Sequence, residues 1–145
     1  IGNEDKAAPE PEDKDKTLTV SYVTGWPIDM IYGYLHQNYE KKGFDDAMVN
    51  ENLAFKDMNK SIIRNKILMV FREINVKYDV MKRNIETKYE ICKSAGLLTD
   101  MASLDNLLSI IKTHKDELAQ LENDFRNNST EVLVPLMSYE CGFLR

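Results

Sequence analysis

"KILMVFREINVKYDVMKRNIETKYEIC", residues 66–92, carries the pattern that decides the fold. Apolar side chains recur there in steps of three, four and four residues, at Ile67, Val70, Ile74, Tyr78, Met81, Ile85, Tyr89 and Cys92. Steps of this size place the side chains on one face of an α-helix. Because the pattern repeats every eleven residues rather than every seven, two such helices are expected to lie almost straight, with a slight right-handed wrap.

The helix is expected to extend beyond the quoted stretch, since no proline or glycine occurs between Gly43 and Gly96. A cap at Asp45 or Asp46 predicts one helix of roughly 45 to 50 residues, about 70 Å long. The apolar residues within 62–71 surround the helix axis, which predicts a segment buried on all sides. Gly96 fits the left-handed position that follows a helix end, so residues 94–100 are expected to form a turn.

A second helix is predicted over about residues 101–127. Its seam has steps of three and four, at Leu104, Leu107, Ile111, His114, Leu118, Leu121 and Phe125. Such heptads are typical of coiled-coil pairing, so residues 44–128 are predicted to form a long antiparallel helical hairpin. His114 is expected to be a buried, hydrogen-bonded group that fixes the register of this seam. Replacing it with leucine would then raise thermal stability.

The remaining segments are shorter. Residues 1–16 form an acidic polar tail that cannot build a core of its own. Residues 17–24 alternate between apolar and polar, which predicts a half-buried strand or arm. Pro27 in a first turn and Gly43 at an end predict a short helix within residues 25–43. Residues 129–145 are expected to be a C-terminal docking arm, in which residues 131–134 pair with the strand. The predicted fold is therefore mainly α: a coiled-coil-like helical hairpin, a short N-terminal helix and a small β element from the two terminal arms.

Composition narrows the class of protein. The formal net charge of -5 argues against a nucleic-acid binder by charge alone. No apolar run approaches the roughly 18 residues that a membrane helix needs, so a soluble protein without membrane insertion is expected. No signal-peptide pattern is present, and the location within a cell stays open. The two cysteines, Cys92 and Cys141, are expected to be free thiols, with a disulfide between them as the alternative.

Residues suited to catalysis or metal binding are few. His36 and His114 are the two histidines, and no His, Cys or carboxylate group has metal-ligand spacing. There is no glycine-rich phosphate loop and no HExxH motif. The pair Asp45–Asp46 is explained by helix capping. The sequence therefore predicts no catalytic residues, no metal, no cofactor and no enzymatic activity.

A difference in helix length predicts a protein-binding site. The second helix, folded back at Gly96, reaches only along roughly the last 27 residues of the first. The short helix of about 21 Å cannot cover the remaining stretch of about 35 Å. An uncovered apolar surface usually marks an interaction site. The candidate partner-binding residues of this helix segment are Phe55, Met58, Ile62, Ile63 and Ile67.

The C-terminal arm is a second candidate for partner binding. Tyr139, Phe143 and Leu144 are large apolar side chains near the end of the chain. Aromatic side chains often anchor a segment in a groove of a partner. The alternative is that they pack on the chain's own hairpin.

These features favour a non-enzymatic structural or assembly subunit that makes helix-mediated protein–protein contacts within a larger complex. The partners would be further copies of the chain or other subunits, as in a phage virion or another macromolecular machine. The alternative is a helical nucleic-acid-binding protein with a phosphate-binding stripe of Lys56, Lys60, Arg64, Lys77, Lys82, Arg83 and Lys88. Salt separates the two, because a phosphate binder loses affinity steeply as salt rises. The same basic residues would otherwise form a solvated face and contact the acidic second helix.

Overall fold

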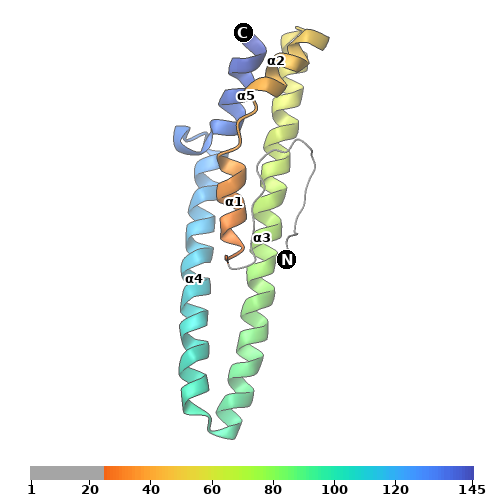
Figure 1. Cartoon of the computed structure of the whole chain (residues 1–145). Coiled ribbons are helices and arrows are strands. Elements are labelled where there is room, and N and C mark those ends of the chain that lie inside the picture. Colours follow the sequence, from red (N-terminus) through yellow and green to blue (C-terminus); the bar gives the residue numbers. More distant parts are fainter. Residues whose placement is uncertain (1–24) are drawn as a thin grey trace, which may run out of the picture.

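The computed structural model describes residues 25–145, which are mainly helical and contain no strand (Figure 1). The helices in chain order are α1 (Ile28–Leu35), α2 (Glu40–Val49), α3 (Leu53–Ala95), α4 (Leu98–Arg126), the 3-10 helix η1 (Thr130–Val132) and α5 (Val134–Leu144). The predicted hairpin is confirmed: α3 and α4 run antiparallel side by side and form a rod. Helices α2 and α5 gather at the end of the rod that is opposite the turn.

The turn of the hairpin follows the predicted chemistry. Gly96 has a φ of 71°, in the left-handed region that favours glycine. The Leu97 N–H then donates to the Cys92 carbonyl oxygen at 2.9 Å, which satisfies one of the last carbonyls of α3.

The start of α3 differs from the prediction of an uninterrupted helix from Asp45. Helix α2 ends at Val49, residues 50–52 are not helical, and α3 begins at Leu53. The Asn52 side chain accepts a hydrogen bond from the Ala54 N–H at 2.8 Å, and that of Asn50 accepts one from the Asn52 N–H at 2.9 Å. Asparagine caps of this kind end and start helices without any glycine or proline.

The core lies in one half of the rod. Helix α1 packs against α3 and alongside α4, and its Ile28, Ile31 and Leu35 side chains are buried (Figure 1). They meet buried residues of the hairpin, which are Ile63, Ile67, Val70, Phe71, Ile74, Tyr78, Ile111, Leu118 and Phe125. Beyond Tyr78, no side chain between residues 79 and 110 is fully buried. The reason is that two helices alone leave both sides of their seam open to water.

The C-terminal segment differs most from the prediction. Residues expected to form a strand and a docking arm instead form η1 and α5, so the predicted β element has no C-terminal strand. Pro135 stands in the first turn of α5, where its missing N–H costs no hydrogen bond. The other expected strand, residues 17–24, lies outside the described residues. Helix α5 packs mainly on α2 and also on the beginning of α3.

Gly43 was expected to end a helix, and this was wrong because it lies inside α2. A Cβ atom on Gly43 would collide with the backbone of Tyr139 and Phe143, and one on Gly142 would collide with the backbone of Glu40. The two helices therefore cross backbone to backbone at a pair of glycines. This close crossing fixes α5 on α2.

Candidate protein-binding surface

The predicted partner-binding segment of α3 is divided by the structure. Ile63 and Ile67 are buried in the chain's own core, and Phe55 packs half-buried against it. Met58 and Ile62 remain exposed, at 53% and 59% of their full surface. The part of α3 that α4 does not reach exists as expected, but α1, α2 and α5 cover its inner side. The difference in helix length therefore does not by itself require a partner.

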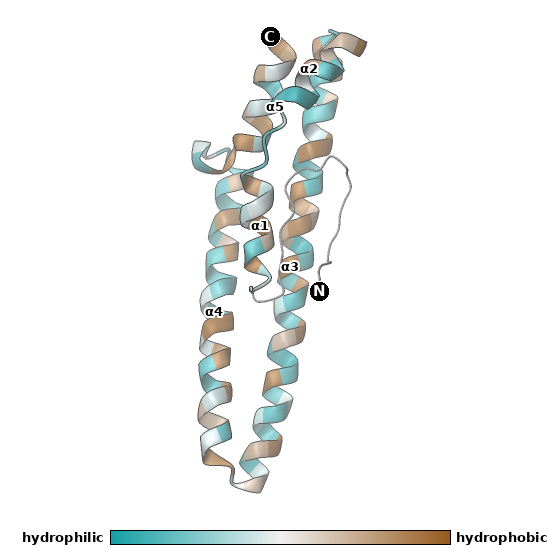
Figure 2. Ribbon diagram, in the orientation of Figure 1, coloured by the Kyte–Doolittle hydropathy of each residue, from teal (hydrophilic) through white to brown (hydrophobic). Residues whose placement is uncertain are grey.

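Exposed apolar side chains form a second row along α3, which we call the outer α3 face. Its members, between 41% and 66% exposed, are Met58, Ile62, Met69, Val76, Val80 and Ile91. At 3.6 residues per turn these positions fall within about 60° of one another around the helix. The buried row that includes Ile67, Ile74 and Tyr78 lies on roughly the opposite side. Figure 2 shows hydrophobic residues recurring along α3 between hydrophilic ones, from the core end down to the turn.

A signal for this face is present in the sequence. Met58, Met69, Val80 and Ile91 recur every eleven residues, the same period as the buried row. Within residues 62–71 the two rows lie next to each other in sequence, which gave the impression of a helix buried on all sides. That interpretation was wrong, because Ile62 and Met69 are largely exposed. Two rows with one period are only separable once the packing of α1 and α4 shows which one is inside.

Basic residues border the outer α3 face on both sides. Lys66, Lys77 and Lys88 follow one edge at eleven-residue spacing, and Arg72 and Arg83 follow the other. Within residues 25–145 none of the five makes an ion pair. The Lys66 ammonium lies 6.0 Å from the centre of the Tyr34 ring. The face is thus an apolar row between cationic edges.

The predicted phosphate-binding stripe does not form one surface. Lys56 and Lys60 both pair with Glu140 of α5, at 3.3 and 2.6 Å. Arg64 donates to the Phe125 carbonyl oxygen at 3.3 Å and to Asn128 at 2.6 Å. These three side chains therefore connect α3 to α5 and to the end of α4. Of the other four members, Lys77 and Lys88 share one side of α3, whereas Lys82 and Arg83 lie on other sides of the helix.

The predicted anchors of the C-terminal arm are likewise divided. Tyr139 and Phe143 are buried at 0% and 5% exposure, and Leu144 is exposed at 59%. The first two pack within the chain, which is the alternative that the sequence left open. They are not accessible to a partner while α5 is in place.

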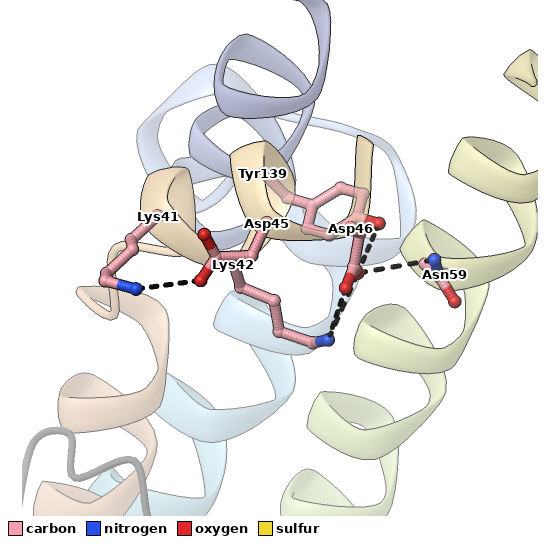
Figure 3. Close-up of polar contacts among 6 residues, drawn as sticks. All are labelled: Lys41, Lys42, Asp45, Asp46, Asn59 and Tyr139. Atoms are coloured by element: carbon pink, nitrogen blue, oxygen red, sulfur yellow. Dashed lines mark hydrogen bonds and ion pairs between the residues drawn. The ribbon is translucent and has the colours of Figure 1, made fainter. Parts of the chain in front are cut away.

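Asp46 of α2 joins three elements through one carboxylate, as Figure 3 shows. Its oxygen accepts hydrogen bonds from the Tyr139 hydroxyl at 2.8 Å and from the Asn59 side chain at 3.3 Å, and Lys42 pairs with it at 3.1 Å. Burial, followed by the Asp46 hydrogen bond, raises the pKa of Tyr139 to about 12. The tyrosine is therefore a neutral donor around pH 7 and serves to hold α5 on α2 and α3.

A shallow groove of about 420 Å³ lies between α5 and α3. It is lined by Lys60, Arg64, Asn128, Leu133, Leu136, Met137, Glu140, Cys141 and Leu144. Its charged groups are already engaged, because Lys60 pairs with Glu140 and Arg64 with Asn128. The groove therefore offers a ligand little beyond the exposed Met137 and Leu144 side chains.

A polar junction in the middle of the rod contains His114. The buried Tyr78 hydroxyl accepts the Ile28 N–H at 3.0 Å and lies 2.8 Å from His114 Nδ1. Trp26 packs its ring at right angles to the histidine ring, with centroids 5.1 Å apart. The prediction that His114 is hydrogen-bonded is confirmed, although its side chain is only half-buried. The junction fastens the start of α1 to both long helices.

Metal sites, disulfides and membrane-spanning helices are absent from the part of the chain that the structure describes. No three His, Cys, Asp or Glu side chains gather where they could hold a metal ion in residues 25–145. Cys92 and Cys141 are free thiols. No helix within residues 25–145 has the length and apolar character needed to cross a membrane.

No family model, curated protein or solved structure matches this chain.

Proposed function

We propose that this protein is a non-enzymatic assembly subunit that uses the outer α3 face to make helix-mediated contacts with another protein in a larger complex. The observation that carries the proposal is the row of six exposed large hydrophobic residues between Met58 and Ile91. Exposed large hydrophobic side chains that recur on one side of a helix are a candidate for a protein interface. Covering it releases about 25 cal/mol for each Å² of apolar surface.

The shape of the rod supports the same proposal. The row runs over roughly 50 Å of α3, because each helical residue adds about 1.5 Å. One straight side of a rod suits repeated side-by-side contacts, as in a virion or another macromolecular machine. The half-buried seam beyond Tyr78 adds apolar surface near the turn.

A double substitution tests this function. Met69→Glu with Val80→Glu places two charges in the centre of the outer α3 face, where both native side chains are exposed. We expect loss of the assembly, measured as loss of the crosslinked products that the chain forms in its native extract. The helical content, measured by circular dichroism, should stay unchanged.

The matched control is Ser109→Glu with Thr113→Glu, two exposed positions of α4 that make no side-chain hydrogen bond to described residues. It adds the same charge and should leave the crosslinks intact. If the α3 variant also left them intact, the outer α3 face would not be an assembly surface.

Nucleic-acid binding is the second candidate, and the cationic edges of the outer α3 face are the observation that favours it. Binding to phosphates through Lys66, Lys77, Lys88, Arg72 and Arg83 would weaken steeply as salt is raised. Contacts through the apolar row would not. Binding of the full chain to a duplex of random sequence, followed over a salt series, separates the two candidates.

A further inference from the structure

We infer that the occupant of the outer α3 face is an amphipathic α-helix of a partner protein, with apolar residues in its centre and acidic residues along both edges. The inference rests on the proposed function and specifies the chemistry of the partner. Three observations carry it: the straight course of the apolar row, the charge of its edges, and the lack of a matching surface on α3 and α4 of a second copy.

The course of the row specifies a helix. Met58, Met69, Val80 and Ile91 repeat every eleven residues, or about 3.67 per turn. A row with this period follows the helix axis closely and does not spiral away from a neighbour. A second helix lying alongside α3 can therefore touch the row over its whole length, whereas an extended segment would match only a few of these positions.

The charge of the edges specifies acidic neighbours. Lys66, Lys77 and Lys88 line one edge, and Arg72 and Arg83 line the other. Glu73, Asp79 and Glu90 are the acidic residues on this side of α3, and Asp79 is already paired with Lys115 of α4, so cations remain in excess along the edges. Charges beside an apolar seam set partner choice and orientation in paired helices. Each exposed ion pair contributes little, but five such pairs all favour an acidic partner helix.

The long helices α3 and α4 of a second copy offer no suitable surface. If two outer α3 faces met, basic edges would oppose basic edges in either orientation, which is unfavourable. The acidic α4 would suit the charge, but its outer side carries polar residues such as Asp105, Ser109 and Asp116 instead of an apolar row. The occupant is therefore a different polypeptide.

Two synthetic helical peptides test the inference against the full chain. Both carry leucine at the three-four-four spacing; one has glutamate along its edges and the other has lysine. We expect the glutamate peptide to bind about tenfold more tightly at low salt, an advantage that several weak ion pairs can supply. Binding is measured by fluorescence anisotropy of the labelled peptides.

A charge exchange makes the test reciprocal. Lys77→Glu with Arg83→Glu should reverse the preference, so that the lysine peptide binds this variant more tightly. Met69→Glu with Val80→Glu should abolish binding of both peptides, and the control Ser109→Glu with Thr113→Glu should change neither affinity. Circular dichroism confirms that each variant is folded.

Four outcomes would overturn the inference. If both peptides bind equally, or if neither binds, the acidic helix is rejected. If the chain self-associates and the Met69→Glu, Val80→Glu variant is monomeric, the occupant is a second copy, and the proposed assembly function survives. If the same variant instead unfolds more easily as a monomer, the face is covered by the chain's own residues 1–24, and the proposed function is rejected as well.

Discussion

Two glycines, Gly43 and Gly142, decide at the residue scale whether α5 can dock. Each lies where the backbone of the opposite helix occupies the space that a side chain would need. A glycine inside a helix costs about 1 kcal/mol relative to alanine, and here the close crossing of α2 and α5 offsets that cost. The surrounding contacts of Tyr139 and Phe143 depend on this approach.

We expect Gly43→Ala and Gly142→Ala each to lower the free energy of unfolding by about 2 kcal/mol. The added methyl group must push two backbones apart, which outweighs the gain in helix propensity. Urea unfolding followed by circular dichroism measures the change. Ser94→Ala, at an exposed site on α3, is the control and should be neutral or slightly stabilising. Equal stability of all three variants would contradict the close crossing.

The junction at His114 changes the prediction made from the seam alone. On a seam, a polar residue reduces stability, and its replacement by leucine would raise the melting temperature. In the structure, however, the histidine is the partner of a Tyr78 hydroxyl that is fully buried. Removing it leaves that hydroxyl without the acceptor for its proton.

We therefore expect His114→Leu to lower stability by about 1 to 2 kcal/mol, the cost of a buried donor without a partner. The double variant His114→Leu with Tyr78→Phe removes both polar groups and should recover part of the loss. Thermal unfolding of the two variants measures the difference. A higher melting temperature for His114→Leu alone would show that the hydrogen bond is unimportant.

At the element scale, α1 determines which part of the hairpin has a core. Ile74 and Ile85 occupy the same position in successive eleven-residue repeats, and the sequence does not distinguish them. Ile74 is fully buried, whereas Ile85 is half-buried. The reason is that α1 begins beside Tyr78 and does not extend along the rod as far as Ile85. Equivalent positions in the repeat thus contribute unequally to stability.

Truncating these two isoleucines measures that inequality directly. We expect Ile74→Ala to cost about 3 kcal/mol through lost contacts and the cavity left behind, and Ile85→Ala to cost about 1 kcal/mol. Urea unfolding of the matched pair gives both values under one set of conditions. Similar losses would mean that the hairpin beyond Tyr78 is covered by something other than α1.

The docking of α5 on α3 is expected to depend on pH. Hydrogen bonds and charge from Lys60, and then from Lys56, lower the pKa of Glu140 below its usual value of 4.5. A carboxyl group whose pKa is lower in the folded state stabilises the fold above the pKa of the unfolded state. That contribution is lost as the pH falls through the folded pKa.

We expect the urea midpoint of the native chain to fall more than that of Glu140→Gln when the pH is lowered from about 6 to about 3. The substitution removes the titrating group but keeps the shape of the side chain. Glu86→Gln, which alters an exposed pair within α3, is the control and should follow the native chain. Parallel curves for all three proteins would show that Glu140 does not hold α5.

Over the whole molecule, stability is expected to decrease along the rod. The fully buried side chains of the hairpin lie within residues 63–78 and 111–125, while none lies between residues 79 and 110. Local opening requires less free energy where few side chains are buried. The turn end of the rod should therefore open more often than the end that carries α1, α2 and α5.

Amide hydrogen exchange measures this gradient. We expect the slowest exchange in residues 63–78 and 111–125, and faster exchange toward Gly96 from both helices. Addition of the glutamate-edged peptide should slow exchange in α3 if it binds the outer face. Uniform protection along the free rod would contradict a core confined to one end.

The sequence by itself determined the hairpin, because the periods of the apolar residues and the glycine at position 96 act locally along the chain. It also indicated the hydrogen-bonded His114 and the part of α3 that outreaches α4. It missed the break at residues 50–52, because it relied on glycine and proline as the signals for a helix end. The candidate residues Met58 and Ile62 were found from sequence, and the rest of the outer α3 face was not.

Only the tertiary structure decided which apolar row is inside and what covers the beginning of α3. Helix α5 is far from that segment in sequence, and no local pattern specifies that Gly142 will cross Gly43. Burial depends on contacts between elements that meet only after folding, whereas helix periodicity depends on neighbours a few residues away. For this reason Ile62 and Ile63, which are adjacent and chemically identical, differ in burial only in the folded chain, where Ile63 is buried and Ile62 is exposed.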